Sequence, residues 1–422
     1  MSRPSVVVPR PYRMRNQIQH YAWGTRDAEA FIPRLLGQDP EPGLPYAELW
    51  LGTHPNAPSE VELDDGVTAR LDTWIASHPS PTLGIEVMRR FGALPFLLKV
   101  LSAGEALSIQ AHPSRTQAAA LHAADPVHYP DDNHKPEVAI ALDGLAALVG
   151  FKPFHELSAT LQHYPEIATF IGGPATELVA GSENPAPDVS SRLTHALFAA
   201  LIRRALEEPN ALATTVDALA QRLSANVGGL TETELWFLEL CQQYGNRDVG
   251  VFTLFLLNLV HLRPGEGIFT NAGVPHAYLR GNIVECMANS DNVVRVGLTP
   301  KYKDAETLLR IADTTPQQPQ ILEGDACTLR EGVTAATYRT PAPEFEVRRW
   351  RLAPGTEHIL DKGSGPAILL VTAGAVELAW DGGHADYRQG DSAFLPACLA
   401  ECTVHAKDDS ELFLARVPEG RR

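Results

Sequence analysis

Gln110 and His112 have the spacing expected of two ligands of one metal ion on a β-strand. They lie two residues apart in the segment GEALSIQAH, and Gly104 precedes Gln110 by six residues. Because successive side chains of a strand point to opposite faces, residues two apart share a face and would point to one interior position. Taken alone, the pair is better explained as a surface glutamine and a hydrogen-bonded structural histidine. Further ligands are needed.

Glu137 and His276 are the further ligand candidates, each in a strand-like segment. Glu137 lies in KPEVAIAL, and His276 ends a segment that contains Gly265, Asn271 and Gly273. This segment resembles the second metal signature of cupin barrels, with asparagine in place of proline, and GEALSIQAH resembles the first, with glutamine in place of one histidine. Two imidazoles, a carboxylate and an amide oxygen predict one Zn²⁺ or other divalent ion per chain.

A short segment near residue 290 gathers several charged side chains. It places Glu285, Asp291, Arg295 and Lys301 within seventeen residues, among apolar residues and turn formers. An arginine at such a site can hold a phosphate in a bidentate manner or polarise a sugar oxygen. The alternative is an ordinary solvated run of charges around a tight polar turn at ANSDN.

Lys135 and Ser108 are expected on the same strand faces as the ligands. Lys135 stands two residues before Glu137, and Ser108 two residues before Gln110. A desolvated lysine near a metal can have a lowered pKa and exchange protons near neutrality. The alternative for Lys135 is an ordinary surface lysine. His134 is kept as a candidate substrate-binding residue. The other histidines without a strand partner are expected to be surface or structural residues.

The elements that must position these residues are mainly strands. Residues 44–150 read as short apolar strands, with one helix capped by Ser114, and strand patterns return from about residue 265. Between them, leucines at helical spacing and a capping box at Thr231 and Glu234 predict helices, while GGPATELVAGSENPAPD predicts a polar loop. Many short strands suggest double-sheet jelly rolls.

We therefore expect a mainly β chain with cupin-type double-stranded β-helix (jelly-roll) domains and a helical insert. The predicted domains are a catalytic cupin core (1–151 and 263–336), a helical insert (152–262) and a C-terminal jelly roll (337–422). In the last, Gly390 and Pro396 fit the second cupin signature, but Cys398 and Glu401 replace its glycine and histidine. A metal-free domain is predicted there.

The overall composition narrows the classes of function. A net charge of −16 argues against a nucleic-acid partner, but allows a small phosphorylated substrate bound by a local basic cluster. Five scattered cysteines and no long apolar segment predict a cytoplasmic protein with free thiols and no membrane association. A monomer is expected, and a dimer is left open by the sequence.

Several segments together resemble type I phosphomannose isomerases. They are YAWGT, ELWLGTHPNAPS, LPFLLKVLSAGEALSIQAHP, NHKPEVAIAL and GNIVECMANSDNVVRVGLTPKYKD. The resemblance implies an aldose–ketose isomerase that interconverts mannose 6-phosphate and fructose 6-phosphate through a cis-enediol. It also implies one zinc ion and residues in three roles. The implied ligands are Gln110, His112, Glu137 and His276; the implied active-site arginine is Arg295; the implied sugar-phosphate pocket contains Ser108, Lys99, Lys135, Lys301, Trp23 and Tyr278.

The residue that transfers the proton is left open by the sequence. Lys135 is the leading candidate for the base or proton shuttle, and Asp291 and Glu285 are rivals. Two other functions also stay open. One is a non-catalytic sugar-phosphate-binding cupin, and the other is an iron cupin dioxygenase, which would prefer two histidines and one carboxylate.

Overall fold

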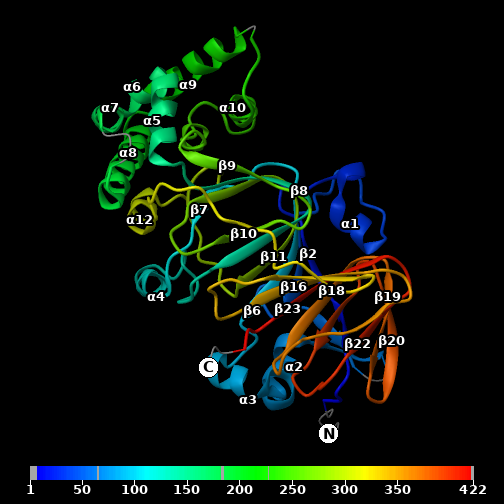
Figure 1. Ribbon diagram of the computed structural model, residues 1–422. Helices are drawn as coiled ribbons and strands as arrows, with labels where there is room; N and C mark the ends of the chain where they lie inside the picture. The colour runs from blue at the N-terminus through cyan, green and yellow to red at the C-terminus, as the bar shows by residue number, and fades with distance from the viewer. Residues whose placement is uncertain (1–6, 64–65, 182–184, 227, 420–422) are drawn as a thin grey trace.

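Strands make up most of the protein, as expected, and the helices gather mainly on one side (Figure 1). The structure is a computed structural model that describes residues 7–63, 66–181, 185–226 and 228–419. Within these ranges the strands are β1 (Tyr12–Arg15), β2 (Gln17–Gln19), β3 (Glu48–Gly52), β4 (Glu60–Glu62), β5 (Thr68–Arg70), β6 (Phe96–Ala103), β7 (Ile109–Ala111), β8 (Glu137–Phe151), β9 (Leu257–Leu262), β10 (Gly267–Thr270), β11 (His276–Ala288), β12 (Val294–Gly297), β13 (Ile321–Leu322), β14 (Cys327–Arg330), β15 (Val333–Tyr338), β16 (Glu346–Leu352), β17 (Glu357–Ile359), β18 (Ala367–Ala373), β19 (Ala375–Trp380), β20 (Gly383–Arg388), β21 (Ser392–Leu395), β22 (Thr403–Ala406) and β23 (Ser410–Arg416).

The helices of the same ranges include a 3₁₀ turn near the start of the chain. They are η1 (Asp27–Glu29), α1 (Phe31–Leu36), α2 (Leu71–Ser77), α3 (Pro79–Phe91), α4 (Arg115–Ala124), α5 (Phe154–His163), α6 (Pro165–Ile171), α7 (Gly173–Ala180), α8 (Pro187–Glu207), α9 (Pro209–Ser224), α10 (Glu232–Tyr244), α11 (Gly250–Thr253) and α12 (Ala305–Ile311). None of these helices combines the length and the apolar character needed to cross a lipid bilayer.

The first large sheet carries the predicted metal ligands. Its strand order in the described ranges is β13-β10-β8-β11-β6-β3-β2, with β9 paired to β8, and β7 paired to both β11 and β12. β6 pairs with β11 along its whole length, and each of its residues is buried. A strand covered on both faces reads as a continuous apolar run, which explains FLLKVLSA. Lys99 and Ser102 are the polar exceptions in that run.

The predicted helices of the insert form between β8 and β9, and the helix predicted to start at Ser114 forms before β8. Ser114 caps α4 and Thr231 caps α10, each in a capping box, so both predicted caps are confirmed. α8 buries Leu193, Leu197 and Leu201 at helical spacing, which is the pattern of a helix packed along one face. The polar loop predicted for residues 172–188 is wrong over Gly173–Ala180, which form α7. Residues 182–184 lie outside the described ranges.

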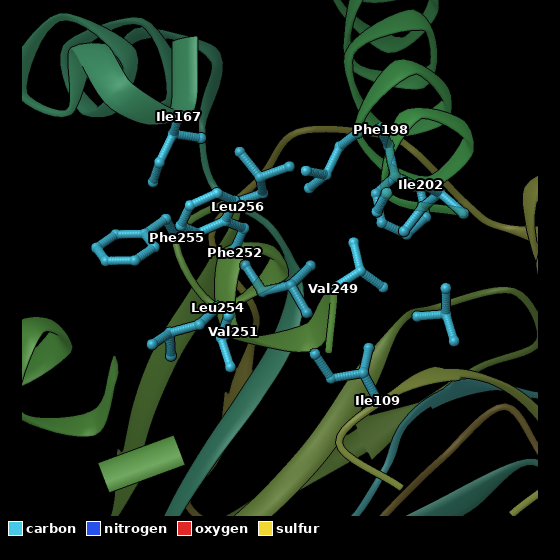
Figure 2. Close-up of a cluster of buried hydrophobic side chains, with 14 of the residues drawn as sticks. Ile109, Ile167, Phe198, Ile202, Val249, Val251, Phe252, Leu254, Phe255 and Leu256 are labelled. Carbon is cyan, nitrogen blue, oxygen red and sulfur yellow. The ribbon is translucent and has the colours of Figure 1, made fainter. Parts of the chain in front are cut away.

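The segment before β9 joins the helical part to the first sheet. Figure 2 shows Val249 and Phe252 packed in one cluster with side chains of the helices, such as Ile167 and Phe198, and with Ile109. Ile109 belongs to β7, the strand that contains Gln110. The hydrophobic contact therefore ties the helices to the strand that carries a predicted metal ligand.

The second large sheet combines the two ends of the chain. Its order in the described ranges is β14-β15-β16-β23-β18-β21-β1-β4-β5, and a smaller sheet has the order β17-β22-β19-β20. β1 pairs antiparallel with β21, with Tyr12 opposite Phe394. In Figure 1 the blue N-terminal strand accordingly runs into the orange and red C-terminal strands. The mainly β fold is thus confirmed.

The strand pairing suggests different domain bounds from those predicted. Residues 257–262, which were assigned to the helical insert, form β9 and pair with β8. Leu257, Leu259 and Leu262 of this strand belong to the hydrophobic clusters that pack on the sheet. The bound at 336/337 falls inside β15, which pairs with β16 of the C-terminal sheet. We therefore propose that the helical insert ends near Thr253 and that the C-terminal domain begins near Cys327, completed by β1.

Candidate active site

Three predicted ligands meet at the ends of adjacent strands. His112 follows β7 directly, while Glu137 begins β8 and His276 begins β11. In the sheet His276 lies opposite Gln110 and Val149, whereas Glu137 lies opposite Met287 at the other end of the β8–β11 pairing, so the side chains meet across the fold and not along one sheet edge. One ligand atom of each of His112, Glu137 and His276 lies within 4.8 Å of the others, and the three residues are buried.

Both histidines turn Nε2 toward the carboxylate of Glu137. Nδ1 of His112 lies 2.9 Å from the main-chain oxygen of Asn292, and Nδ1 of His276 lies 2.9 Å from that of Val274. A carbonyl accepts only from N–H, so both Nδ1 atoms carry the proton and both Nε2 atoms keep a lone pair. These Nε2 atoms lie 3.4 Å and 2.9 Å from Glu137 oxygens. This is the tautomer that a metal requires.

The Nε2 atom of His112 has no hydrogen-bond partner although it is completely buried. It lies 3.4 Å from an oxygen of Glu137, but a deprotonated nitrogen and a carboxylate are both acceptors, so no hydrogen bond joins them. Burial, reinforced by the charge of Lys135, lowers the pKa of His112 to about 4, so its ring is neutral near neutrality. Because an unpaired buried acceptor is costly, the site fits a bound cation.

Gln110 lies beside this group rather than against the carboxylate. Its amide nitrogen is 3.5 Å from Nε2 of His276, and its oxygen accepts a hydrogen bond of 3.2 Å from the hydroxyl of Ser108. A half-turn of the amide would exchange its oxygen and nitrogen and present the oxygen to the ligand group. Ser108 and Gln110 thus share a face, as their spacing predicts.

Lys135 also contacts the carboxylate of Glu137. Its Nζ lies 2.6 Å from Oε2 of Glu137, and both residues are buried. Burial alone would raise the pKa of Glu137, but Lys135 and the two histidines outweigh it and hold that pKa well below its usual range. Glu137 is therefore ionised and able to bind a cation.

A second buried network lies next to the first. Nζ of Lys99 lies 3.4 Å from Glu48 and 3.2 Å from Glu285. Burial alone would lower the pKa of Lys99, but the two carboxylates outweigh it, so its pKa is raised and the ammonium stays charged. The hydroxyl of Tyr278 contacts Glu285 at 3.1 Å and Glu137 at 3.3 Å, and it links the two networks.

A cavity of about 760 Å³ opens beside these networks. Arg295 lines it from β12, and no hydrogen bond or ion pair joins its guanidinium to the described residues. Lys301 also lines the cavity, with Nζ 5.0 Å from the centre of the Tyr21 ring. Burial, together with the nearby Arg295, lowers the pKa of Lys301. Trp23 lines the same cavity, in which Arg295 and Lys301 have no carboxylate partner among the described residues.

Asp291 reaches the cavity but is held by its neighbours. One carboxylate oxygen lies 3.3 Å from Nε2 of His54, and the other accepts a hydrogen bond of 2.7 Å from Asn56. Burial alone would raise the pKa of Asp291, but the contact with His54 outweighs it and the pKa is lowered. Asp291 is thus ionised at neutral pH.

The predicted site residues line this cavity or, like His112 and His276, contact Glu137, which lines it, with one exception. His134 points elsewhere, with Nε2 2.8 Å from Glu344 of the C-terminal part of the chain and 3.0 Å from Arg115. The sequence analysis did not single out Glu48 or His54. The signal for Glu48 was present, because a glutamate in the buried strand ELWLG needs a cationic partner.

Comparison with known proteins gives one consistent family. The model of the phosphomannose isomerase type I catalytic domain matches residues 12–154. Mannose-6-phosphate isomerase of Macaca fascicularis is 39% identical over 385 residues, which cover 88% of this chain and 89% of that protein. Mannose-6-phosphate isomerase 2 of Arabidopsis thaliana is 36% identical over 414 residues, which cover 95% and 91%.

Solved structures agree with these relatives. A mutant of phosphomannose isomerase from Salmonella typhimurium superposes with a TM-score of 0.83 at 28% identity, covering 96% of this chain and 99% of that one. A zinc-bound holo form of mannose 6-phosphate isomerase gives a TM-score of 0.82 at 28% identity, covering 97% and 100%. Matched over nearly its whole length in sequence and in structure, this chain belongs to the type I phosphomannose isomerase family.

Proposed function

We propose that the protein is a zinc-dependent aldose–ketose isomerase that interconverts mannose 6-phosphate and fructose 6-phosphate. The observation that carries this proposal is the buried group of His112, Glu137 and His276 beside a cavity lined by Arg295 and Lys301, neither of which has a carboxylate partner in the described part of the chain. The names of the relatives favour it over a non-catalytic sugar-phosphate-binding protein. The zinc in a structural neighbour favours it over an iron dioxygenase.

We propose Gln110, His112, Glu137 and His276 as the ligands of the zinc ion. The unpaired Nε2 of His112 and the ionised Glu137 support this set, because imidazole and carboxylate are ordinary zinc ligands. A bound zinc ion would supply fixed positive charge for the sugar oxygens that become negative during isomerisation.

The phosphate of the substrate is best placed between Arg295 and Lys301. Lys99 and Lys135 also belong to the pocket, but each already contacts at least one carboxylate within 3.4 Å. Arg295 can offer two parallel N–H groups to a phosphate, which adds geometric selectivity. Ser108 lines the same cavity and has a hydroxyl that can donate to the sugar or its phosphate. Anchoring the phosphate orients the carbon atoms that exchange the proton.

Lys135 is our leading candidate for proton transfer between C2 and C1. Its Nζ has one carboxylate partner, whereas Lys99 is held by two and stays charged. Glu285 is a weaker candidate because it is held by Lys99 and Tyr278. Asp291 is similarly held by His54 and Asn56. The base must carry a proton from one carbon of the sugar to the next. This favours Lys135, which has fewer side-chain partners than its rivals.

The finer description of the fold belongs to the same proposal. We infer that the first sheet is a cupin-type double-stranded β-helix and that the C-terminal strands form a metal-free jelly roll. The antiparallel pairing of both regions supports this layout. A cytoplasmic location and a monomeric state remain predictions of the sequence.

A coupled assay on the purified protein tests the proposed function. Fructose 6-phosphate formed from mannose 6-phosphate is measured before chelation, after removal of metal, and after addition of zinc. We expect turnover to disappear with the metal and to return with stoichiometric zinc. Binding of mannose 6-phosphate without turnover in the zinc-loaded protein would overturn the proposal in favour of a binding protein.

A further inference from the structure

The turn between β11 and β12 reaches both the ligand group and the cavity. Its residue Asn292 accepts the hydrogen bond from Nδ1 of His112 at 2.9 Å through its main-chain oxygen. The preceding residue, Asp291, lines the cavity. A displacement of this turn would therefore disturb a ligand's orientation and the pocket at the same time.

One carboxylate, that of Asp131, holds this turn in place. Its Oδ1 accepts hydrogen bonds from the hydroxyl of Ser290 (2.8 Å), the amide of Asn292 (3.0 Å) and the main-chain nitrogen of Asn133 (3.0 Å). Its Oδ2 accepts from the main-chain nitrogen of Asp291 at 2.8 Å. The two oxygens thus serve different parts of the turn.

The groups that donate to Asp131 are largely shielded from water. Ser290 and Asn292 are buried, so water cannot readily replace the acceptor that Asp131 provides. The Asn292 amide also donates to the main-chain oxygens of Asp131 and Asn133, at 2.7 and 2.9 Å. The Ser290 hydroxyl likewise has a second acceptor, the main-chain oxygen of Asn133 at 3.1 Å. The main-chain N–H groups of Asp291 and Asn133 therefore depend most on the Asp131 carboxylate, and a shielded donor that loses its acceptor carries a desolvation penalty, so the turn would rearrange.

We propose that Asp131 is a positioning residue of the active site, acting through the turn of residues 289–292. Through Oδ1 it fixes Asn292 and thereby the ring orientation and tautomer of His112. Through Oδ2 it fixes the main chain at Asp291 and thereby the position of that carboxylate in the cavity. Asp131 itself is not among the residues that line the cavity. The inference deepens the proposed function and depends on it.

Two variants of Asp131 separate the two effects. Asp131→Ala removes both oxygens, so both zinc affinity and kcat should fall. Asp131→Asn keeps an oxygen for Ser290, Asn292 and Asn133, but places an N–H group opposite the N–H of Asp291. This variant should keep its zinc affinity and lose kcat/KM. Asp132→Asn is the matched control, because Asp132 is the exposed neighbour.

Zinc affinity is measured on the metal-free proteins by competition with a chromophoric chelator. The kinetic constants kcat and KM are measured on the zinc-loaded proteins. For Asp131→Ala we expect zinc binding about 10- to 100-fold weaker, as found when groups behind metal ligands are removed. For Asp131→Asn we expect kcat/KM about 10- to 100-fold lower, the effect of misplacing a pocket group by about 1 Å. Asp132→Asn should match the wild type in both.

Equal zinc affinity and equal kcat/KM in wild type, Asp131→Asn and Asp132→Asn would overturn the proposal, even if Asp131→Ala fails to fold. Loss of zinc affinity in Asp131→Asn as large as in Asp131→Ala would also contradict the assignment of separate roles to the two oxygens. Failure of the proposed function itself is distinguished by the wild type, which would then show no turnover of mannose 6-phosphate while its zinc affinity could still be compared with that of the variants.

Discussion

Replacement of Lys99 by methionine should destabilise the protein strongly at neutral pH. Lys99 is 6% exposed and lies 3.2 Å and 3.4 Å from two carboxylates that are themselves buried. At an effective dielectric constant of about 20, each contact corresponds to about 5 kcal/mol of attraction, much of it offset by desolvation. Methionine keeps the apolar stem but leaves Glu48 and Glu285 without their cation. The expected loss is about 3–5 kcal/mol of unfolding free energy.

The unfolding free energy lost in Lys99→Met should become smaller as the pH falls. In the wild type the raised pKa of Lys99 means that its contribution is fully present below the unfolded pKa of about 10.4, and is lost only as the pH rises through the folded value. In Lys99→Met this contribution is absent. Burial already raises the pKa of Glu285, although Lys99 partly offsets it, so without Lys99 that pKa rises further. The folded variant then binds more protons than the unfolded chain above about pH 4.3, and gains stability on acidification.

Urea unfolding at pH 7.5 and pH 5.5, followed by tryptophan fluorescence, measures both effects. Lys407→Met is the matched control, because Lys407 is an exposed lysine paired with Asp386, and its urea midpoint should not change. Lys99→Met/Glu285→Gln should recover part of the lost stability, since one buried charge is removed. A midpoint for Lys99→Met equal to the wild type at pH 7.5, or a deficit that does not depend on pH, would refute the reasoning.

Three further changes address the pocket and the ligands. Arg295→Ala should lower kcat by about 100- to 1000-fold, the cost of removing one fixed positive group, while zinc content stays the same; unchanged turnover would exclude Arg295 from the reaction. Gly273→Ala should weaken zinc binding and cost at least about 1–3 kcal/mol of stability, because φ is +80° and the new Cβ would lie 2.6 Å from the Ile311 oxygen. A zinc affinity equal to that of the wild type would contradict a role of the turn at Gly273 in positioning the ligands. Tyr278→Phe should cost about 1–3 kcal/mol, because Glu137 and Glu285 lose the single hydroxyl donor that lies within reach of both; urea unfolding measures the loss, and an unchanged midpoint would contradict it.

The sequence predicted the ligands because a simple geometric rule connects them to the fold. Strand alternation places Gln110 and His112 together, and the glycines at positions 265 and 273 mark turns with positive φ before His276. Gly273 also donates its main-chain N–H to the oxygen of His112 at 2.8 Å, so the turn and the ligand are joined directly. Such local rules need no knowledge of distant contacts.

Other features could not be predicted because they depend on partners far away in the chain. The alternation in β1 shows which face is buried but not that the strand joins β21, 380 residues later. Lys99 was placed in the pocket by resemblance, yet its partners Glu48 and Glu285 come from two other strands and fix it as a structural cation. His134 was assigned to the pocket because it precedes Lys135, but Glu344 from the C-terminal part of the chain turns it away.

The balance of buried charge supports a divalent cation independently of family resemblance. The two linked networks contain three buried carboxylates, of Glu48, Glu137 and Glu285, but only two buried lysines, Lys99 and Lys135. One negative charge is therefore uncompensated in the folded protein, and burial of an unpaired charge is costly. A bound divalent ion would change this excess to a net positive charge. An anionic sugar phosphate entering beside Arg295 and Lys301 would then meet a field that attracts it, which the network without the ion does not provide.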